Sequence, residues 1–451
     1  MSGLTTGALR VGVFAALVAF ATYLASFRTP VTVDGVSNVL LAYSLAGDHD
    51  LFLDEFESGF EQLSFYRYRS QAHSVPVFPP GAALYATPFA AIGLALGIAP
   101  PDVASVSIVG KTAAALAAAV SVLFVYLLSA RITGRGWALL VTALYAFGTS
   151  TWPVSGGALW QHGPAQALLA ATQFLLWPAR HEHGRVARAG LAAGLAAVVR
   201  IQDAAFGLAA AAYVATRRRR WLGAFLAWAL PGAIVLIAFD LAAYGSPISR
   251  SYTAFYKMGD IVAGVAGNLV SPSRGLFVAS PFLPLAVFAL IRRARASDDV
   301  GILIRTQLVA AGALLVVHGS YVDWFGGVTY GNRYLADALP LLAIGLALWT
   351  RRHHRSRPAR WGLAVLSIPS VAIAATGALF YDISLAWEAL SSDHDALMWD
   401  LQRSQWWFTA THALERLDGL AVASIVLISL AWTSLAVTAF VAARPGRSRR
   451  R

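Results

Sequence analysis

The stretch from Ser105 to Ala130, SVSIVGKTAAALAAAVSVLFVYLLSA, decides the fold. It is longer than the roughly 20 apolar residues that a helix needs to cross the hydrocarbon core of a bilayer. Comparable runs recur along the 451-residue chain, in which 57% of side chains are hydrophobic and 13% are charged, with a mean hydropathy of +0.60. This composition excludes a soluble globular protein. The sequence therefore predicts an integral membrane protein.

The apolar runs are continuous rather than alternating, which favours membrane-spanning helices over the strands of a β-barrel. We therefore predict an all-α polytopic membrane protein in which residues 1–451 form a single membrane-embedded domain. The chain leaves no room for a nucleotide-binding module or a separate soluble catalytic domain. Because it contains no cysteine, it can have no disulfide, thiolate zinc site or cysteine nucleophile.

Charge distinguishes the two predicted sides of the membrane. The formal net charge is +12, and most basic residues lie in clusters between apolar runs, at 131–135, 180–188, 217–220, 292–295, 351–360 and 444–451. Such clusters are typical of cytoplasmic loops, and they do not form the soluble basic face that would indicate nucleic-acid binding. The acidic residues fall mostly in the other gaps, which we predict to face outward: 28–104, 150–163, 245–275, 319–334 and 381–419. We expect a multi-pass protein of the inner (plasma) membrane.

Hydropathy and charge together predict about twelve transmembrane helices with both termini inside. The predicted spans are 11–27, 105–130, 136–150, 164–179, 187–200, 202–216, 221–244, 276–291, 302–318, 335–350, 361–380 and 420–442. A further apolar run at 82–98 would reverse the sidedness of every later loop if it crossed, so we expect an interfacial or re-entrant helix there, in the first outer loop. Because 187–200 and 202–216 are short, a helical hairpin that does not fully cross is the alternative for that pair.

Asp34 is the first candidate catalytic residue. It lies a few residues beyond the first span, at the start of a predicted amphipathic helix whose dipole favours an anion. An N-cap is the competing interpretation, because Asp is a preferred capping residue. Asp48 and Asp50 follow in the same outer loop, whereas the acidic residues from Asp54 to Glu61 are typical of solvated loop charges.

Basic side chains of the outer loops are candidates for binding an anion. Arg67, Arg69 and His73 precede the rigid turn at 79–81 and could bind an anionic head group. His162 lies just before the predicted span 164–179, at its outer end. These positions form the first part of a predicted substrate-binding set.

Arg200 ends an apolar run, where an unpaired cation at mid-bilayer would cost roughly 2.5–3.5 kcal/mol. We expect it at the outer boundary, paired with Asp203, with a neighbour or with a ligand. The later outer gaps add further residues to the set, namely Arg250, Lys257, Arg274, Arg333 and Tyr334. Arg offers a planar fork for phosphate, and paired glycines permit close backbone approach. Salt-bridged loops are the alternative for each of these cations.

Several short motifs occur in a characteristic order along the chain. They are Asp34 after the first span, Pro79-Pro80-Gly81, Gly148-Thr-Ser-x-Trp152-Pro153, Arg200 ending a span of small residues, Ser271-Pro-Ser-Arg274-Gly-Leu-Phe-Val-Ala-Ser280-Pro281, and Trp324-x-Gly-Gly-x-x-x-Gly-x-Arg333-Tyr334. In this order the sequence resembles the GT-C superfamily of integral-membrane glycosyltransferases, especially the bacterial protein O-mannosyltransferase and aminoarabinose transferase group. The resemblance extends from Asp34 to about residue 350.

The resemblance implies transfer of a sugar from a polyprenyl-phosphate carrier to an acceptor at the outer membrane face, with inversion at the anomeric carbon. It assigns the general base to Asp34, with Asp50 or Asp48 as a second acidic residue. The implied partners are the lipid-linked donor, membrane lipids and a glycan, lipid or protein acceptor. No cofactor is certain, although a divalent metal on Asp34, Asp48 and Asp50 is possible in such a site. A phosphate leaving group needs no general acid.

A polytopic transporter or a flippase of lipid-linked sugars is the alternative function, because many spans and buried charges suit it equally well. No pseudo-repeat between two halves is evident, and the polar residues gather in outer loops rather than at mid-membrane. These features favour the transferase. A non-catalytic scaffold is the other alternative, and Asp34 argues against it.

Overall fold

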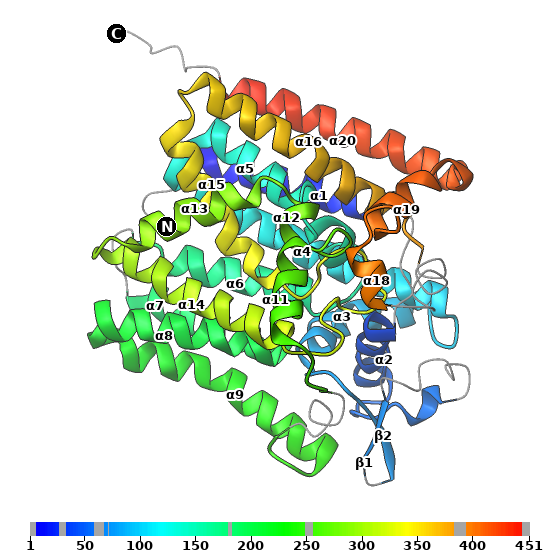
Figure 1. The fold of residues 1–451 in the computed structure, drawn as a ribbon. Helices are drawn as coiled ribbons and strands as arrows, with labels where there is room; N and C mark the ends of the chain where they lie inside the picture. The colour runs from blue at the N-terminus through cyan, green and yellow to red at the C-terminus, as the bar shows by residue number, and fades with distance from the viewer. Residues whose placement is uncertain are drawn as a thin grey trace.

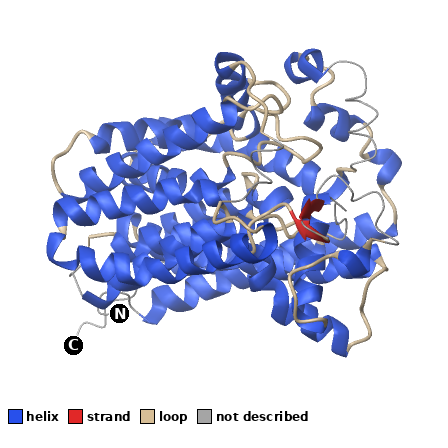
Figure 2. Ribbon diagram, turned by 90° about the horizontal axis from the view of Figure 1, so that it is seen from below, coloured by secondary structure: helices blue, strands red, loops and turns tan. Residues whose placement is uncertain are grey.

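The computed structural model describes residues 6–26, 33–57, 67–70, 72–178, 183–248, 256–382 and 394–443. Helices dominate these residues, and the long helices run roughly side by side between the two ends of the molecule (Figure 1, Figure 2). The bundle contains α1 (Thr6–Ala25), α4 (Val103–Thr133), α5 (Arg135–Phe147), α6 (His162–Leu176), α7 (His183–Val199), α8 (Ala204–Arg217), α9 (Leu222–Tyr244), α13 (Leu283–Ala294), α14 (Asp299–Gly319), α15 (Leu339–His353), α16 (Arg357–Phe380) and α20 (Gly419–Ala443).

The remaining α-helices and the two strands have between 4 and 15 residues. They are α2 (Val33–Gly47), β1 (Arg67–Ser70), β2 (His73–Pro76), α3 (Gly81–Ala95), α11 (Ile261–Val270), α12 (Leu276–Ala279), α18 (His394–Trp399) and α19 (Gln405–Thr411). The strands form an antiparallel hairpin in which Arg67 pairs with Pro76 and Ser70 with His73. The hairpin, α2 and α18 gather toward one end of the bundle, on the right in Figure 1.

Each of the twelve predicted spans overlaps a helix of the bundle, which confirms the all-α membrane fold. Within the described part of the chain, six helices are long and apolar enough to cross a membrane: Thr6–Ala25, Val103–Thr133, Arg219–Tyr244, Asp299–Gly319, Arg357–Phe380 and Gly419–Thr438. The pair α7 and α8 has 17 and 14 residues, so α8 reaches only about 21 Å at 1.5 Å per residue. The apolar run at 82–98 is helical as α3, and it packs with α2 against the start of α4.

Side-chain caps and close packing explain where these helices begin and how they associate. Asp102 accepts hydrogen bonds from the Ala104 and Ser105 backbone N–H groups and so begins α4. Helices α7 and α9 touch through glycines: a Cβ on Gly194 would lie 2.4 Å from the Ala229 carbonyl oxygen. Small residues thus let the two backbones approach closely, as is common between membrane helices.

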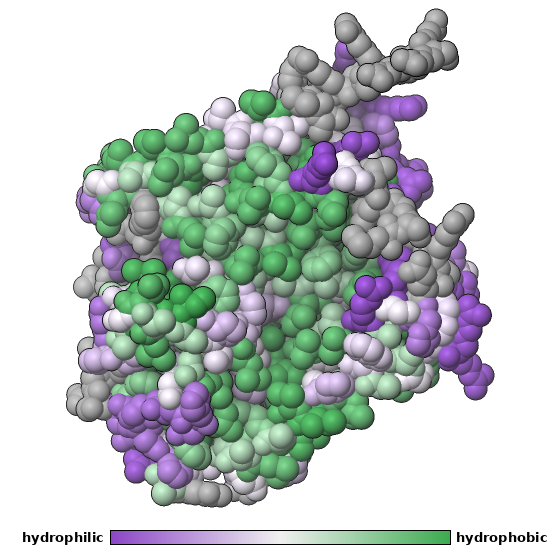
Figure 3. All heavy atoms as spheres, turned by 180° about the vertical axis from the view of Figure 1, so that it is seen from behind, coloured by the Kyte–Doolittle hydropathy of each residue, from purple (hydrophilic) through white to green (hydrophobic). Residues whose placement is uncertain are grey.

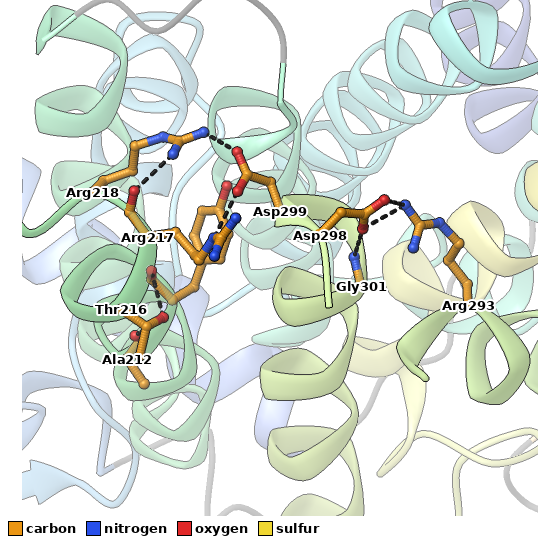
Figure 4. A network of polar contacts seen from close by, with 9 residues as sticks. Ala212, Thr216, Arg217, Arg218, Arg293, Asp298, Asp299 and Gly301 are labelled. Atoms are coloured by element: carbon orange, nitrogen blue, oxygen red, sulfur yellow. Dashed lines mark hydrogen bonds and ion pairs between the residues drawn. The ribbon is translucent and has the colours of Figure 1, made fainter. Parts of the chain in front are cut away.

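A network of Arg and Asp side chains joins the turns at one end of the bundle (Figure 4). Arg217 Nε donates to Asp299 Oδ1 at 2.7 Å, and Arg218 binds the other oxygen of Asp299. Arg293 Nη2 donates to Asp298 at 2.6 Å, and this hydrogen bond together with the Gly301 N–H lowers the pKa of Asp298. The network places the end of α8 beside the start of α14, as expected if these helices cross in opposite directions.

Hydrophobic residues cover the middle of the face seen in Figure 3, and hydrophilic residues gather toward its two ends. Helices at the periphery expose large apolar side chains, such as Leu208, Val309, Trp361 and Leu430. A soluble protein rarely exposes so much apolar surface. The distribution is that of a bundle whose sides face lipid and whose ends face water.

Candidate functional site

Asp34 and Arg333 form a sheltered ion pair. Asp34 lies in the first turn of α2, and its Oδ2 atom accepts a hydrogen bond from Arg333 Nη1 at 2.5 Å. The two side chains are 13% and 14% exposed. An ion pair that water largely cannot reach is screened much less than a surface pair. Because 299 positions separate the two residues in the chain, only the fold brings them together.

Two aromatic rings lie close to the Arg333 guanidinium. Its central carbon lies 4.9 Å from the ring centroid of Trp160 and 5.2 Å from that of Tyr334. Both distances permit cation–π attraction, and Trp160 is itself buried. The structure thus places Trp160 against Arg333, a candidate substrate-binding residue.

Tyr334 connects this pair to a buried basic cluster. Its ring stacks on His318, with centroids 4.3 Å apart and an interplanar angle of 6°. His318 Nε2 lies 2.8 Å from Arg200 Nη2. Since arginine can only donate, Nε2 must be the acceptor and His318 is therefore neutral. The His318 ring is held by stacking on one face and by a hydrogen bond at Nε2, so its orientation is fixed. The Tyr334 ring that stacks on it is fixed in turn.

Arg200 forms a buried ion pair with Asp337, which lies in the short 3-10 helix η6 (Ala336–Ala338). His162 Nδ1 lies 3.1 Å from Asp337 Oδ1 and 3.2 Å from Arg200 Nη1, so it either donates to the carboxylate or accepts from the guanidinium. Removing one partner of such a pair would leave an uncompensated buried charge. Of the alternatives left open for Arg200, the structure shows an ion pair with a neighbouring carboxylate, that of Asp337.

Four helix ends converge on this cluster. Arg200 takes an extended conformation at the end of α7, His162 begins α6, and His318 lies in the last turn of α14. Gln166, one turn into α6, donates from Nε2 to the Ala336 carbonyl at 2.7 Å and so anchors η6. Of the predicted site residues, the structure joins Asp34, His162, Arg200, Arg333 and Tyr334 through an unbroken series of contacts.

Asp48 and Asp50 lie at the opposite end of α2 from Asp34. The helix rises about 1.5 Å per residue, so Asp48, which follows its last residue, is about 20 Å along the axis from Asp34. Asp50 caps local groups, accepting from the Ser44 hydroxyl at 2.8 Å and the Phe52 N–H at 2.9 Å. The three carboxylates cannot bind one metal ion together, which corrects that expectation. In the ranges that the structure describes, no group of three acidic, His or Cys side chains suits a metal.

Arg274 is buried, and backbone carbonyls surround it. Nη2 donates to the Gly327 carbonyl at 2.9 Å, and Nη1 contacts the carbonyls of Thr329 and Gly331. Burial lowers the pKa of Arg274 to about 10, so the side chain remains charged at neutral pH. The sequence made Arg274 a candidate for binding phosphate, and that role stays a prediction; in the structure its guanidinium donates to carbonyls of the glycine-rich segment that precedes Arg333.

The hairpin residues lie in local contacts. His73 Nδ1 is 2.6 Å from Asp54 Oδ2, and its ring stacks on Phe52 at 4.0 Å. Arg69 is exposed and lies 3.5 Å from Glu57 Oε1. Both side chains thus pair with nearby carboxylates, and their role in binding an anionic head group stays a prediction.

The remaining predicted residues are Arg67, Lys257 and Arg250. Arg67 lies in β1, paired through its backbone with Pro76. Lys257 is exposed, and its carbonyl accepts from the Val322 N–H at 2.8 Å. Arg250 lies outside the described residues. Their substrate-binding roles stay predictions.

Sequence reasoning missed Asp337, His318 and the contact of Trp160. Both Asp337 and His318 fall at the outer ends of predicted spans, where they were counted with the apolar residues. An ionisable residue within a span is itself a functional signal, because it needs a partner in the bundle interior. Asp337 could have been found by that criterion and matched with Arg200.

Comparison with known proteins identifies the fold. No family model matches the sequence, and no curated protein matches it. The structure is similar to that of ArnT from Cupriavidus metallidurans bound to undecaprenyl phosphate, with a TM-score of 0.57 and 14% identity over 97% of this chain and 77% of ArnT. The same ArnT in its apo state gives a TM-score of 0.55 and 15% identity over 96% of this chain and 76% of ArnT.

The archaeal oligosaccharyltransferase AglB from Archaeoglobus fulgidus, in complex with an inhibitory peptide and a dolichol-phosphate, is also similar. Its TM-score is 0.52 and its identity 12%, over 89% of this chain and 60% of AglB. ArnT and AglB are membrane glycosyltransferases of the GT-C superfamily. The chain therefore has the GT-C fold, which confirms the fold that the sequence motifs suggested.

Proposed function

We propose that this protein is a glycosyltransferase that moves a sugar from a polyprenyl-phosphate carrier to an acceptor at the outer membrane face, with inversion. The observation that carries the proposal is the sheltered pair of Asp34 and Arg333, which supplies a base and a phosphate-binding cation at one point of a GT-C fold. The lipids in the ArnT and AglB structures, undecaprenyl phosphate and dolichol-phosphate, are of the class that we propose as the carrier.

The proposed reaction takes place at the pair of Asp34 and Arg333. The acceptor hydroxyl gives its proton to the Asp34 carboxylate, and its oxygen attacks the anomeric carbon. The bond from that carbon to the phosphate oxygen breaks, and the carrier leaves as polyprenyl phosphate. Arg333 stabilises the charge on the departing phosphate by charge-assisted hydrogen bonds. Asp34 later releases its proton to water.

The buried cluster supports this reaction by holding Arg333 in place. Arg200 and Asp337 compensate each other's charge, so the cluster adds little net charge beside the reacting pair. The hydrogen bond from Arg200 to His318 fixes the His318 ring, on which Tyr334 stacks. Tyr334 in turn packs against Arg333. We therefore assign Arg200, His162, Asp337 and His318 a positioning role.

The donor class can be tested directly. Purified protein supplied with a polyprenyl-phosphate sugar should release one free polyprenyl phosphate per sugar lost, because the leaving group is the carrier phosphate. The measurement is quantification of both products by chromatography and mass spectrometry. Efficient transfer from a soluble nucleotide sugar without lipid carrier would refute the proposed donor. Movement of the intact lipid-linked sugar across vesicles without cleavage would instead favour a flippase.

The outward orientation of the site can be tested by cysteine labelling, since the chain has no cysteine of its own. Gln402 and Ser297 are both exposed, and they lie in a predicted outer gap and a predicted inner turn. An impermeant thiol reagent applied to intact cells should label Gln402→Cys and leave Ser297→Cys unlabelled until the cells are permeabilised. The reverse pattern would invert the predicted topology and place Asp34 on the cytoplasmic side.

A further inference from the structure

Residues 326–331, here called the glycine loop, wrap around Arg274. Gly326, Gly327 and Gly331 have positive φ angles of 82°, 67° and 66°, which side chains other than glycine adopt rarely. These conformations let the carbonyls of Gly327, Thr329 and Gly331 all reach the Arg274 guanidinium. The loop is therefore organised around an internal cation.

Gln405, in the first turn of α19, completes this arrangement with its side-chain amide. Oε1 accepts from Arg274 Nη1 at 2.8 Å and from the Gly331 N–H at 2.7 Å, while Nε2 donates to the Thr329 carbonyl at 2.8 Å. Its backbone N–H also donates to the Ser273 hydroxyl at 3.1 Å. One side chain from the last outer segment thus bonds both to the buried cation and to two residues of the glycine loop.

The glycine loop is linked to Arg333 by a packing contact at its start and by the chain itself at its end. At its start, a Cβ on Gly326 would lie 3.2 Å from Arg333 Cγ, so the loop backbone packs against that side chain. At its end, Gly331 is followed by Asn332, whose Nδ2 donates to the Asn268 carbonyl at 2.8 Å, and then by Arg333 itself. A shift of the loop would therefore move the guanidinium relative to Asp34.

We propose that Gln405 is a positioning residue of the active site, which holds the glycine loop so that Arg333 stays aligned with Asp34. This proposal rests on the proposed transferase function. It assigns a role in the reaction to the segment before α20, which the sequence motifs did not include. Gln405 reaches the reacting pair only through the loop.

The first test compares Gln405→Ala with Gln402→Ala, an exposed glutamine in the same segment. Gln405→Ala should lower kcat for sugar transfer by about tenfold to hundredfold, because small misplacements of a reacting group have effects of this size. Gln402→Ala should stay within about twofold of wild type. Equal activity of the two variants would overturn the proposal.

A double-mutant cycle separates positioning from general loss of structure. If Gln405 acts through Arg333, then Gln405→Ala should have less than about a twofold effect on kcat when Arg333 is already Ala, which leaves no cation to position. Multiplicative effects of the two substitutions would show that Gln405 acts independently of Arg333 and would refute the proposal.

Hydrogen exchange provides a readout that does not depend on catalysis. Peptides covering 326–335 should exchange faster in Gln405→Ala than in wild type, since the Gly331 N–H loses its acceptor, while Gln402→Ala should not change them. Unchanged exchange in Gln405→Ala would refute the contact. Faster exchange together with a wild-type protein that transfers no sugar would instead refute the transferase function.

Discussion

Asp34→Asn should reduce sugar transfer by roughly 10²–10⁴-fold, the usual contribution of a general base. Asn keeps the size of the side chain but cannot accept a proton at neutral pH. The measurement is kcat for sugar transfer, with binding of polyprenyl phosphate measured on the same preparations. Binding should stay near wild type or tighten, because Arg333 loses the carboxylate that competes with phosphate for it.

Asp102→Asn is the matched control. Asp102 is exposed and caps α4 through two backbone N–H groups, and Asn caps a helix about as well as Asp. This variant should transfer sugar normally. If Asp34 were only a helix-terminal residue, Asp34→Asn would be equally silent. The contact of Asp34 with Arg333, rather than with the backbone of α2, favours the larger effect.

The spans could be predicted from the sequence because hydrophobicity is a local property. Helix α9, for example, spans Leu222–Tyr244 where 221–244 was predicted. The length of an apolar run and the sign of the adjacent charges suffice for this inference. Neither depends on which helices touch.

The partners of the site residues could not be predicted in the same way. Arg200 and Asp337 are 137 positions apart, and the nearer Asp203 was the obvious choice from sequence alone. In the structure Asp203 is buried, and no hydrogen-bond partner for its carboxylate is found among the described residues. Only the convergence of α6, α7 and η6 shows which carboxylate Arg200 meets.

Closeness in the sequence and residue type were also poor guides to which groups meet in the structure. Asp48 and Asp50 share a loop with Asp34 in the sequence, but α2 separates them by its whole length. The glycines near Arg333 suggested close backbone approach to phosphate, which stays a prediction, but the sequence did not show that the carbonyls of Gly327 and Gly331 accept hydrogen bonds from Arg274. In both cases residues were selected as site candidates by their type. The conformation of the backbone decides which groups their atoms contact.

Arg333→Ala should reduce kcat/KM for the lipid-linked donor by roughly 10²–10³-fold, the size of effect seen when one group that stabilises developing negative charge is removed. The substitution also leaves Asp34 without its partner in a sheltered position. Arg403→Ala is the control, because Arg403 is an exposed arginine in the predicted outer gap 381–419 and its ion pair is with nearby Asp400. It should stay within about twofold of wild type.

Arg333→Lys distinguishes a requirement for charge from a requirement for shape. Lysine keeps the positive charge but loses the planar fork that binds phosphate at two points, and it stacks less well between the rings of Trp160 and Tyr334. We expect Arg333→Lys to recover part of the activity lost in Arg333→Ala. The remaining loss should appear in kcat, the rate of transfer at saturating donor. Full recovery would show that a point charge is enough, and no difference between Arg333→Ala and wild type would remove Arg333 from the site. A large effect confined to Arg333, with Arg403→Ala silent, would identify the cation that binds the carrier phosphate.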